Sequence, residues 1–248
     1  MDLFSDLEEP RLSFTMPTGN GYSCRWDDNI QAFILRIPNG ELVFAERFFD
    51  TKISDRSVEY FQENDTFDWA NTDWYQVSAE QFDKVCFTHV NWKRDHMQMY
   101  GKRIPLPRLT SWYGDAGKSY TYSGITSQPN QWNKGLLYIK EKIEQVTALS
   151  FNSVLLNWYR SGEDHMGWHA DDEQELGRNP AIASVNFGAT RDFVLRRIDD
   201  PSKKIVIPLQ HGTLLVMAGE LQHYWQHSVP KRKKVKGSRF NLTFRHII

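Results

Sequence analysis

The chain has 248 residues, of which 40% are hydrophobic and 25% are charged, enough to bury one sizeable core. This composition excludes a disordered chain and a disulfide-stapled mini-protein. Thirty basic and 31 acidic residues give a net charge of −1. Taken over the whole chain, that balance argues against a partner as acidic as nucleic acid.

The charges are nevertheless unevenly distributed. Residues 1–80 hold 16 acidic and 6 basic side chains, whereas residues 81–248 hold 15 acidic and 24 basic ones, so a net −10 is followed by a net +9. Such asymmetry is expected when one part of a protein faces a polyanion and another part does not. A solvated acidic face is the competing interpretation.

The cysteine content and the apolar runs bear on the compartment. The chain has two cysteines, Cys24 and Cys86, too few for a thiolate zinc ribbon, and a reducing compartment is the default. The acidic N-terminal stretch differs from a secretory signal, and no apolar run approaches the ~18 residues needed to span a membrane. We therefore expect a soluble protein without membrane contact, cytoplasmic in a bacterium and nuclear in a eukaryote.

The first 150 residues predict mixed α and β structure, beginning with a hairpin. Residues 32–37 and 41–45 are the predicted strands, because Asn39-Gly40 between them supplies the positive φ that such a turn needs.

A helix, a loop region and a second helix follow. Residues 54–64 predict a short helix with Ser54 or Asp55 as its N-cap. Residues 97–122 are rich in Gly, Pro, aromatic and basic residues, which suits surface loops better than a core. Apolar residues at spacings of three and four then predict an amphipathic helix laid against a sheet. These residues are Leu136, Ile139, Ile143 and Val146.

After Ser150 the chain breaks into short β-prone runs separated by turn residues. Runs of this length and spacing predict a sandwich or barrel of antiparallel strands. The predicted strands are residues 154–159, 181–187, 191–196, 204–209, 213–217 and 238–246.

The first candidate site lies around His169. In an extended segment His169 and Asp171 project to the same face, so an imidazole and a carboxylate can reach one ion. A His-x-Asp pair alone is weak evidence in a chain with eight histidines, and His227 is the candidate third ligand. Two imidazoles and one carboxylate suit a non-haem Fe(II) that activates dioxygen together with a co-substrate, and zinc is the rival metal.

A strand with one polar and one apolar face favours iron over zinc. Two arginines that face an interior need anionic partners, because a buried unpaired guanidinium is very costly. Six residues at ~3.3 Å each put the Cα atoms of Arg239 and Arg245 ~20 Å apart, which leaves room for a small dicarboxylate such as 2-oxoglutarate. An exposed strand face is the alternative. The polar face carries Arg239, Asn241, Thr243 and Arg245, and Asn157 and Tyr159 share one face of their own strand.

Further motifs stand along the same part of the chain. They are Tyr100-Gly-Lys102, Tyr113-Gly-Asp-Ala-Gly117, Tyr120-Thr-Tyr-Ser-Gly124, Pro180-Ala-Ile-Ala-Ser-Val185 and His227-Ser-Val-Pro230. Together with Asn157-x-Tyr159, the His169-x-Asp171-Asp-Glu173 cluster and the arginine strand, they resemble the AlkB family of Fe(II)- and 2-oxoglutarate-dependent nucleic-acid dealkylases. The branch that works on duplex DNA is the most similar, and residues 1–80 remain unmatched.

The resemblance implies an α+β fold with a double-stranded β-helix, or jelly-roll, as its catalytic core. It divides the chain into an N-terminal α/β extension (1–90), a nucleotide-recognition lid with a finger loop and a supporting helix (91–150), and the core (151–248). Flanking helices would pack outside that core.

The resemblance also implies roles for individual residues. His169, Asp171 and His227 would bind the catalytic iron. Asp172 and Glu173 would read the damaged base, since carboxylates suit exocyclic N–H groups and a positively charged alkylated base; a solvated acidic turn is the alternative. The residues that would hold 2-oxoglutarate are Asn157, Tyr159, Arg239, Asn241, Thr243 and Arg245.

Contacts to DNA are implied for three segments. Tyr120 and Tyr122 would stack on or hydrogen-bond an extruded base, although core strand residues look the same in a sequence. Tyr100 would enter the duplex and fill the gap left by that base, with Gly101 allowing a sharp turn. The finger set is Met99, Tyr100, Gly101, Lys102, Arg103 and Arg108, and the basic run is Lys231, Arg232, Lys233, Lys234 and Lys236.

The basic run joins His227 to Arg239 and must therefore lie near the mouth of the site. We interpret it as a phosphate-contacting patch with strongly salt-dependent binding. A nuclear-import signal and a solvated loop are the competing interpretations.

The sequence thus predicts a monomeric dioxygenase that uses Fe(II), 2-oxoglutarate and O2 to demethylate N-alkylated DNA bases such as 1-methyladenine and 3-methylcytosine. The base would be flipped from a duplex, or taken from a single strand, and formaldehyde, succinate and CO2 would be released. The same chemistry on RNA or on a protein side chain is one alternative. A lesion-binding module without turnover is another.

Overall fold

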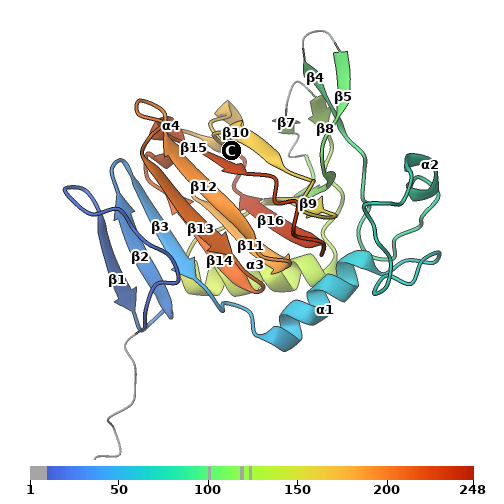
Figure 1. Cartoon of the computed structure of the whole chain (residues 1–248), viewed down its shortest axis with the longest axis horizontal. Coiled ribbons are helices and arrows are strands. Elements are labelled where there is room, and N and C mark those ends of the chain that lie inside the picture. Colours follow the sequence, from blue (N-terminus) through green and yellow to red (C-terminus); the bar gives the residue numbers. More distant parts are fainter. Residues whose placement is uncertain (1–9, 100–101, 118–119, 123–124) are drawn as a thin grey trace, which may run out of the picture.

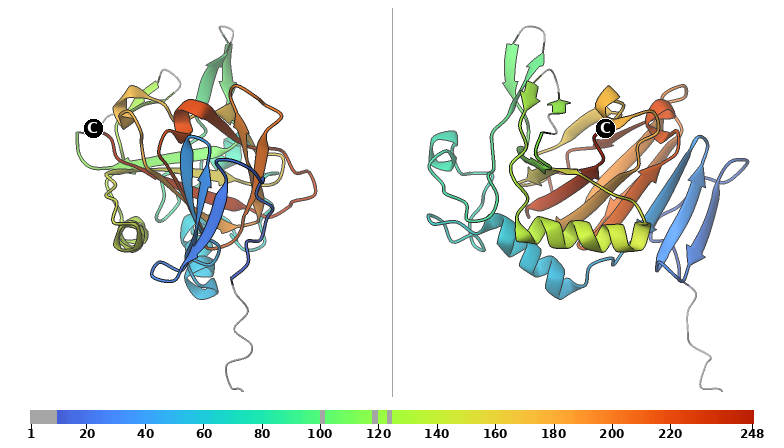
Figure 2. Two further views of the ribbon diagram at one scale, coloured as in Figure 1. Left: turned by 90° about the vertical axis from the view of Figure 1, so that its left-hand side faces the viewer. Right: turned by 180° about the vertical axis from the view of Figure 1, so that it is seen from behind.

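The computed structural model describes residues 10–99, 102–117, 120–122 and 125–248. Its centre is a pair of antiparallel sheets (Figures 1 and 2). The larger sheet has the strand order β1-β2-β3-β14-β11-β16-β9-β6, and the smaller one β10-β15-β12-β13.

The strand bounds follow. The larger sheet contains β1 (Ser23–Asp27), β2 (Ala32–Ile37), β3 (Gly40–Ala45), β6 (Leu109–Gly114), β9 (Ser153–Tyr159), β11 (Ile182–Gly188), β14 (Thr213–Ala218) and β16 (Arg239–Arg245). The smaller sheet contains β10 (Met166–His169), β12 (Arg191–Arg197), β13 (Lys204–Leu209) and β15 (Trp225–Val229). From β9 to β16 the chain passes repeatedly between the two sheets, which is the winding of the predicted jelly-roll.

Apolar side chains fill the space on both faces of the larger sheet. One core lies between the sheets and includes Leu35, Leu195, Ile207 and Leu215. The second lies between the larger sheet and the helices α1 (Thr51–Gln62) and α3 (Lys134–Thr147), which run along its outer face in Figure 2. The helix predicted around residues 136–146 is confirmed, since Leu136, Ile139 and Ile143 are buried in this core.

Two short hairpins stand apart from the sheets. Strands β4 (His96–Met99) and β5 (Lys102–Pro105) pair with each other and project from the body of the molecule (Figure 1). Strands β7 (Tyr120–Tyr122) and β8 (Ile125–Ser127) form the other pair. The remaining helical elements are α2 (Ala79–Phe82), α4 (Leu221–Tyr224) and a 3-10 turn at Gln174–Leu176. Within the described ranges, no helix has both the length and the apolar character that a membrane crossing requires.

The six predicted C-terminal strands are confirmed, but three N-terminal predictions are corrected. Helix α1 begins at Thr51, and its N-cap is Asp50, which accepts from the Ile53 N–H over 2.8 Å. Neither Ser54 nor Asp55 is the cap: Ser54 is buried in the first turn, and its hydroxyl faces the Phe49 carbonyl.

The first hairpin turns at Pro38-Asn39, since Ile37 pairs with Gly40. Asn39 alone supplies the positive φ, at 62°. The third correction concerns residues 97–122, which are more than surface loops. Strand β6 lies within them and is almost entirely buried at one edge of the larger sheet.

Candidate metal and co-substrate site

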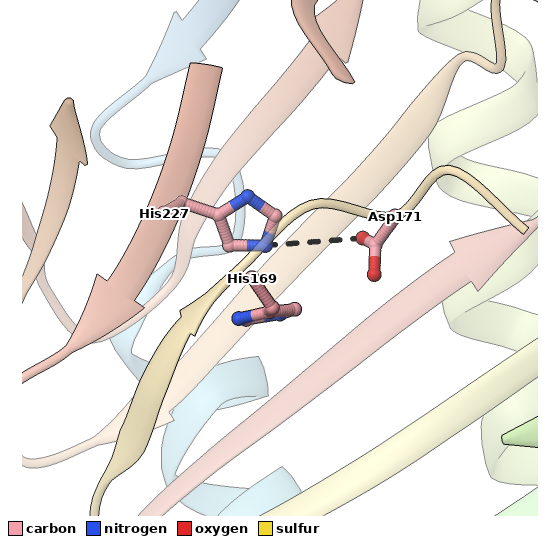
Figure 3. A group of neighbouring side chains, drawn as sticks. All are labelled: His169, Asp171 and His227. Carbon is pink, nitrogen blue, oxygen red and sulfur yellow. Dashed lines mark ion pairs between the residues drawn. The ribbon is translucent and has the colours of Figure 1, made fainter. Parts of the chain in front are cut away.

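Three predicted metal ligands come together where the smaller sheet faces the cavity between the sheets. His169 ends β10 and pairs with His227 on β15, and Asp171 follows two residues after His169. Their ligand atoms all lie within 4.8 Å of one another (Figure 3). His227 Nε2 is 3.9 Å from Asp171 Oδ2.

Neighbouring groups fix the orientation of these side chains. The Nδ1 of His169 lies 3.0 Å from the Gly167 carbonyl, an acceptor, so Nδ1 carries the proton and the Nε2 lone pair is left for an ion. The ring of Phe193 stacks on His227 with 5.0 Å between centroids. The backbone N–H of Asp171 donates to Gln222 Oε1 over 2.9 Å. These supporting contacts hold the cluster in place before any ion binds.

The electrostatics of the cluster favour metal binding. Burial lowers the pKa of His227 to about 3 and also lowers the pKa of His169. Burial alone would raise the pKa of Asp171, but Arg245, whose Nη2 lies 3.0 Å from Asp171 Oδ1, and the two imidazoles bring it to about 2. At neutral pH the site therefore holds two neutral imidazoles and one carboxylate, the protonation state that a metal requires.

The donor set fits a divalent ion of the non-haem iron type. Asp171 Oδ2 is buried, and among the described residues it has no hydrogen-bond partner. An unpaired buried carboxylate oxygen is costly, and a metal ion held together with the two imidazoles would satisfy it. Two histidines and one carboxylate leave positions open for a co-substrate and dioxygen.

These pKa values predict that metal binding releases few protons. Histidines with the ordinary pKa of 6.5 would together release roughly 1.5 protons at pH 6.0. The pKa of His227, about 3, and the lowered pKa of His169 predict a release below one proton at that pH, and His227 contributes only as the pH falls toward 3. Calorimetric titration with Mn²⁺ in two buffers of different ionisation enthalpy measures this number. A release above one proton at pH 6.0 would contradict the buried, neutral state.

A cavity between the sheets opens beside the metal ligands. All nine residues predicted to bind iron or 2-oxoglutarate line it: Asn157, Tyr159, His169, Asp171, His227, Arg239, Asn241, Thr243 and Arg245. The strand register explains this convergence, because Asn157 pairs with Asn241 and Tyr159 pairs with Arg239 on adjacent strands. The apolar side chains of β16 face the other core, as its alternation predicts.

Arg239 is the clearest anion-binding group in the cavity. It is 1% exposed, its Nη2 donates to Asn186 Oδ1, and its guanidinium lies 4.9 Å from the Tyr159 ring centroid. Its Nε and Nη1 are buried and make no hydrogen bond within the described part of the chain. Burial lowers its pKa to about 10, so it remains charged at pH 7. A carboxylate that accepts from both nitrogens would complete this group.

The second predicted arginine has a different partner in the structure. Arg245 donates to Asp171 Oδ1, so it contacts one of the metal ligands. The two arginines therefore differ: Arg245 holds the carboxylate ligand, and Arg239 presents unpaired donors to the cavity.

Arg108 is not placed to meet a flanking phosphate, contrary to the prediction from the finger set. It is 2% exposed, and its Nε donates to Asn157 Oδ1 over 2.7 Å. A basic residue close to a projecting hairpin is expected at the surface, but Arg108 directly precedes the edge strand β6 and is buried there.

The other finger and base-reading residues are only partly described. Tyr100 and Gly101 lie outside the described residues. Met99 ends β4, Lys102 and Arg103 begin β5, and Lys102 is exposed. Tyr120 and Tyr122 lie on β7. Asp172 is exposed and Glu173 is half-buried directly after the metal ligand Asp171.

The basic run forms an exposed loop that is anchored by its backbone. The Arg232 N–H donates to the Gly162 carbonyl over 2.7 Å, and the Gly162 N–H donates to the Val235 carbonyl over 2.8 Å. Lys231 lies 3.6 Å from Glu163, and Arg232 Nε donates to Asp192 over 2.7 Å. Three further cations have no acidic partner in the ranges the structure describes: Lys233, Lys234 and Lys236.

Sequence reasoning missed several residues that shape the site. Phe193, Gln222 and Asn186 support His227, Asp171 and Arg239, respectively. Gln222 and Asn186 give a weak signal, since each is polar and lies near a predicted ligand or strand. Phe193 gives none, because any β-strand phenylalanine looks the same.

The sequence is similar to those of several known proteins. The model of the 2OG-Fe(II) oxygenase superfamily matches residues 74–245. The human DNA oxidative demethylase ALKBH2 is 46% identical over 159 residues, which are 61% of this chain and 61% of that protein. The human alpha-ketoglutarate-dependent dioxygenase alkB homolog 3 is 38% identical over 227 residues, 88% of this chain and 76% of that protein. ALKBH2 of Arabidopsis thaliana is 39% identical over 186 residues, 64% of this chain and 59% of that protein.

The chain spans about six tenths of the length of the ALKBH2 relatives it matches. The superfamily description names Fe(II) and 2-oxoglutarate, and O2 is the third reactant of an oxygenase. The His169, Asp171 and His227 cluster provides the matching ligands. From the extent of these matches, the chain belongs to the 2OG-Fe(II) oxygenase superfamily and, within it, to the AlkB family.

Proposed function

We propose that this protein is a DNA repair dioxygenase that demethylates N-alkylated bases, with 1-methyladenine and 3-methylcytosine as its substrates. The observation that carries the proposal is the buried guanidinium of Arg239, whose Nε and Nη1 have no partner among the described residues, in the same cavity as the His169, Asp171 and His227 cluster. The cluster can bind a metal ion and Arg239 can bind a carboxylate, so one cavity can hold both an ion and a dicarboxylate. The ALKBH2 relatives are named DNA oxidative demethylases, which supports DNA as the substrate.

The side chains of this chain would bind, orient and desolvate the reactants. Bound iron, with 2-oxoglutarate and dioxygen, supplies the oxidation of the N-methyl group, which ends in formaldehyde, succinate, CO2 and the repaired base. Arg239 would hold the distal carboxylate of 2-oxoglutarate, and Asn157 and Asn241 would hydrogen-bond its other oxygens. Met166 and Met217 also line the cavity and add apolar surface to it.

Base recognition would fall to residues at the mouth of the cavity. A base is oxidised only when it leaves the helical stack, so a flipped base from a duplex is the proposed substrate, and the protein would act as a monomer. Asp172 and Glu173 would accept from its exocyclic N–H groups, and Tyr120 and Tyr122 would stack on it. Tyr100 would fill the vacancy in the duplex. The compartment would be that of the DNA, nuclear in a eukaryote and cytoplasmic in a bacterium.

The basic loop, residues 231–236, would contact phosphates mainly through Lys233, Lys234 and Lys236. Lys231 and Arg232 are engaged by Glu163 and Asp192 and would instead hold the loop in place. A loop whose backbone is anchored by hydrogen bonds fits this role, because less of it has to be ordered when DNA binds.

Replacing Lys233, Lys234 and Lys236 by Gln is expected to weaken DNA binding and its salt dependence. Three lost phosphate contacts reduce the slope of log K against log salt by up to about 2.7 for duplex DNA. Binding titrations at several salt concentrations measure that slope. The matched control replaces Lys52, Lys134 and Lys142, which are exposed on α1 and α3, and is expected to leave the slope unchanged. Equal slopes for both variants would remove the loop from the DNA interface.

The shape of the loop can be disturbed without a change in charge. A Cβ at residue 162 would collide with the Arg232 carbonyl oxygen. The Gly162→Ala substitution is therefore expected to reduce DNA affinity, with a smaller change in the salt slope than the lysine variant shows.

A demethylation assay tests the function itself. Purified protein is incubated with Fe(II), ascorbate, 2-oxoglutarate and matched DNA or RNA oligonucleotides that carry one methylated base. Loss of one methyl group by mass spectrometry, together with succinate, is the expected result on DNA. Turnover on RNA alone would favour the RNA alternative, and an absence of succinate with every alkylated substrate would leave only a lesion-binding role.

A further inference from the structure

Arg108 lies on the cavity side of the larger sheet. Leu109 pairs with Trp158 at the start of the β6–β9 ladder, and both belong to the core beneath the helices. Arg108 directly precedes β6, and its Nε donates to Asn157 Oδ1, so its side chain lies on the opposite face of the sheet. Asn157 and Tyr159 line the cavity on that same face.

The amide of Asn157 has one possible orientation beside this guanidinium. An arginine side chain has five N–H donors and no acceptor, so the atom that faces Arg108 Nε at 2.7 Å must be the amide oxygen. The Nδ2 group of Asn157, with its two donors, is then left for the cavity. Without such a partner, an asparagine amide can turn over and exchange donor for acceptor.

The orientation matters because 2-oxoglutarate presents only acceptors to the protein. Its two carboxylates and its keto group contain no N–H or O–H donor at neutral pH. An asparagine that presented Oδ1 would place acceptor against acceptor, which costs the desolvation of both groups.

We propose that Arg108 is a positioning residue of the co-substrate site, which turns Asn157 so that its Nδ2 donors face 2-oxoglutarate. The inference rests on the proposed function, since it concerns the co-substrate of that reaction. A second observation agrees with it. Nη2 of Arg108 is buried without a hydrogen-bond partner in the described segments, and no ion pair to an acidic side chain forms there. Its positive charge adds to that of Arg239 beside the cavity and attracts an anion.

Binding of 2-oxoglutarate to Arg108 variants tests the role. The Mn²⁺-loaded wild type, R108K and R108Q are titrated with 2-oxoglutarate by calorimetry in the absence of DNA. Lysine offers only donors, so R108K is expected to keep the Kd within about threefold of wild type. Glutamine can accept from Nδ2 of Asn157 and lets the amide turn, so the Kd of R108Q is expected to rise about tenfold. In turnover, the KM for 2-oxoglutarate is expected to rise with little change in kcat.

The N157A background separates positioning from direct electrostatics. If Arg108 acts through Asn157, R108Q has no further effect on the Kd once residue 157 is alanine. If the charge alone matters, the tenfold effect persists in N157A, and the positioning role is wrong.

A second variant covers the case in which R108Q fails to fold. N157D keeps the contact with Arg108 as an ion pair but presents an oxygen to the cavity in place of a donor. It is expected to weaken 2-oxoglutarate binding at least tenfold with no loss of thermal stability. An unchanged Kd for N157D would overturn the inference.

The outcomes also separate this inference from the proposed function. If the wild type does not bind 2-oxoglutarate, the proposed function fails. If the wild type binds it and R108Q binds it equally well, only the role of Arg108 fails. If R108Q instead lowers the salt slope of DNA binding by about one and leaves the 2-oxoglutarate Kd unchanged, Arg108 contacts a phosphate.

Discussion

Replacing His169 by Ala is expected to abolish demethylation, with turnover reduced at least ~1000-fold, while the affinity for DNA stays within about threefold of wild type. The reason is that the variant removes one of three metal ligands and touches none of the loop cations. Lys233, Lys234 and Lys236 lie on the loop that follows β15, and the contacts of His169 are with Gly167 and His227. Phosphate contacts supply most of the affinity of such proteins for DNA.

His169 is the suitable ligand to replace because its side chain supports the least structure. Asp171 pairs with the buried Arg245, and breaking a buried ion pair by removing one partner typically costs about 3–5 kcal/mol of folding free energy. His227 lies beneath Phe193 in the core. We therefore expect Asp171→Ala to lose stability as well as activity, and His169→Ala to lose activity alone.

Metal content, succinate formation and DNA binding are measured on the same preparations. A large loss of DNA affinity in His169→Ala would contradict the separation of the metal cluster from the DNA-binding surface. Retention of turnover would contradict the assignment of His169 as a ligand.

The residues that bind the metal and the co-substrate could be found from sequence because their spacing carries the chemistry. The alternation of β16 predicts which side chains share a face, and the structure places Arg239, Asn241 and Thr243 on the cavity side. The His-x-Asp spacing also proves informative, although Asp171 lies two residues beyond the end of β10 and strand alternation does not itself place its carboxylate beside His169. Strand β15, which carries His227, was not predicted as a strand, because its polar residues interrupt the apolar pattern.

The wrong predictions have a common physical cause. Several residues are equally suited to a role by local sequence, and tertiary packing decides which of them takes it. Asp50, Ser54 and Asp55 can all cap a helix, and packing of the first turn decides for Asp50. Arg108 belongs to a basic, proline-rich stretch typical of a surface, yet its place directly before the buried strand β6 puts it in the interior. Which arginine binds the metal ligand and which remains unpaired depends on side-chain geometry that no spacing encodes.

Replacing Arg239 by Met is expected to weaken 2-oxoglutarate binding at least ~100-fold and, at the same time, to leave the ligand-free protein as stable as wild type or more so. The loss of binding follows from the removal of a buried charged partner, which costs about 2–5 kcal/mol. The retained stability of the variant has the same origin, because burying Arg239 without a ligand is costly: two of its nitrogens lack partners among the described residues. An apolar side chain of similar length avoids that desolvation, so the free energy of unfolding is expected to rise by about 0–3 kcal/mol.

Arg191 provides a matched control for this substitution. It is as buried as Arg239, but it donates to the carbonyl oxygens of Ser161, Asp164 and Pro230 over 2.7–3.0 Å. Arg191→Met leaves three carbonyls without that donor, and each buried unsatisfied group costs about 1–3 kcal/mol, so this variant is expected to be destabilised. Thermal unfolding with and without 2-oxoglutarate distinguishes the two. The wild type gains stability from the ligand, Arg239→Met does not, and Arg191→Met starts lower but keeps the gain. If Arg239→Met and Arg191→Met lost equal stability without ligand, Arg239 would serve the fold and not the co-substrate.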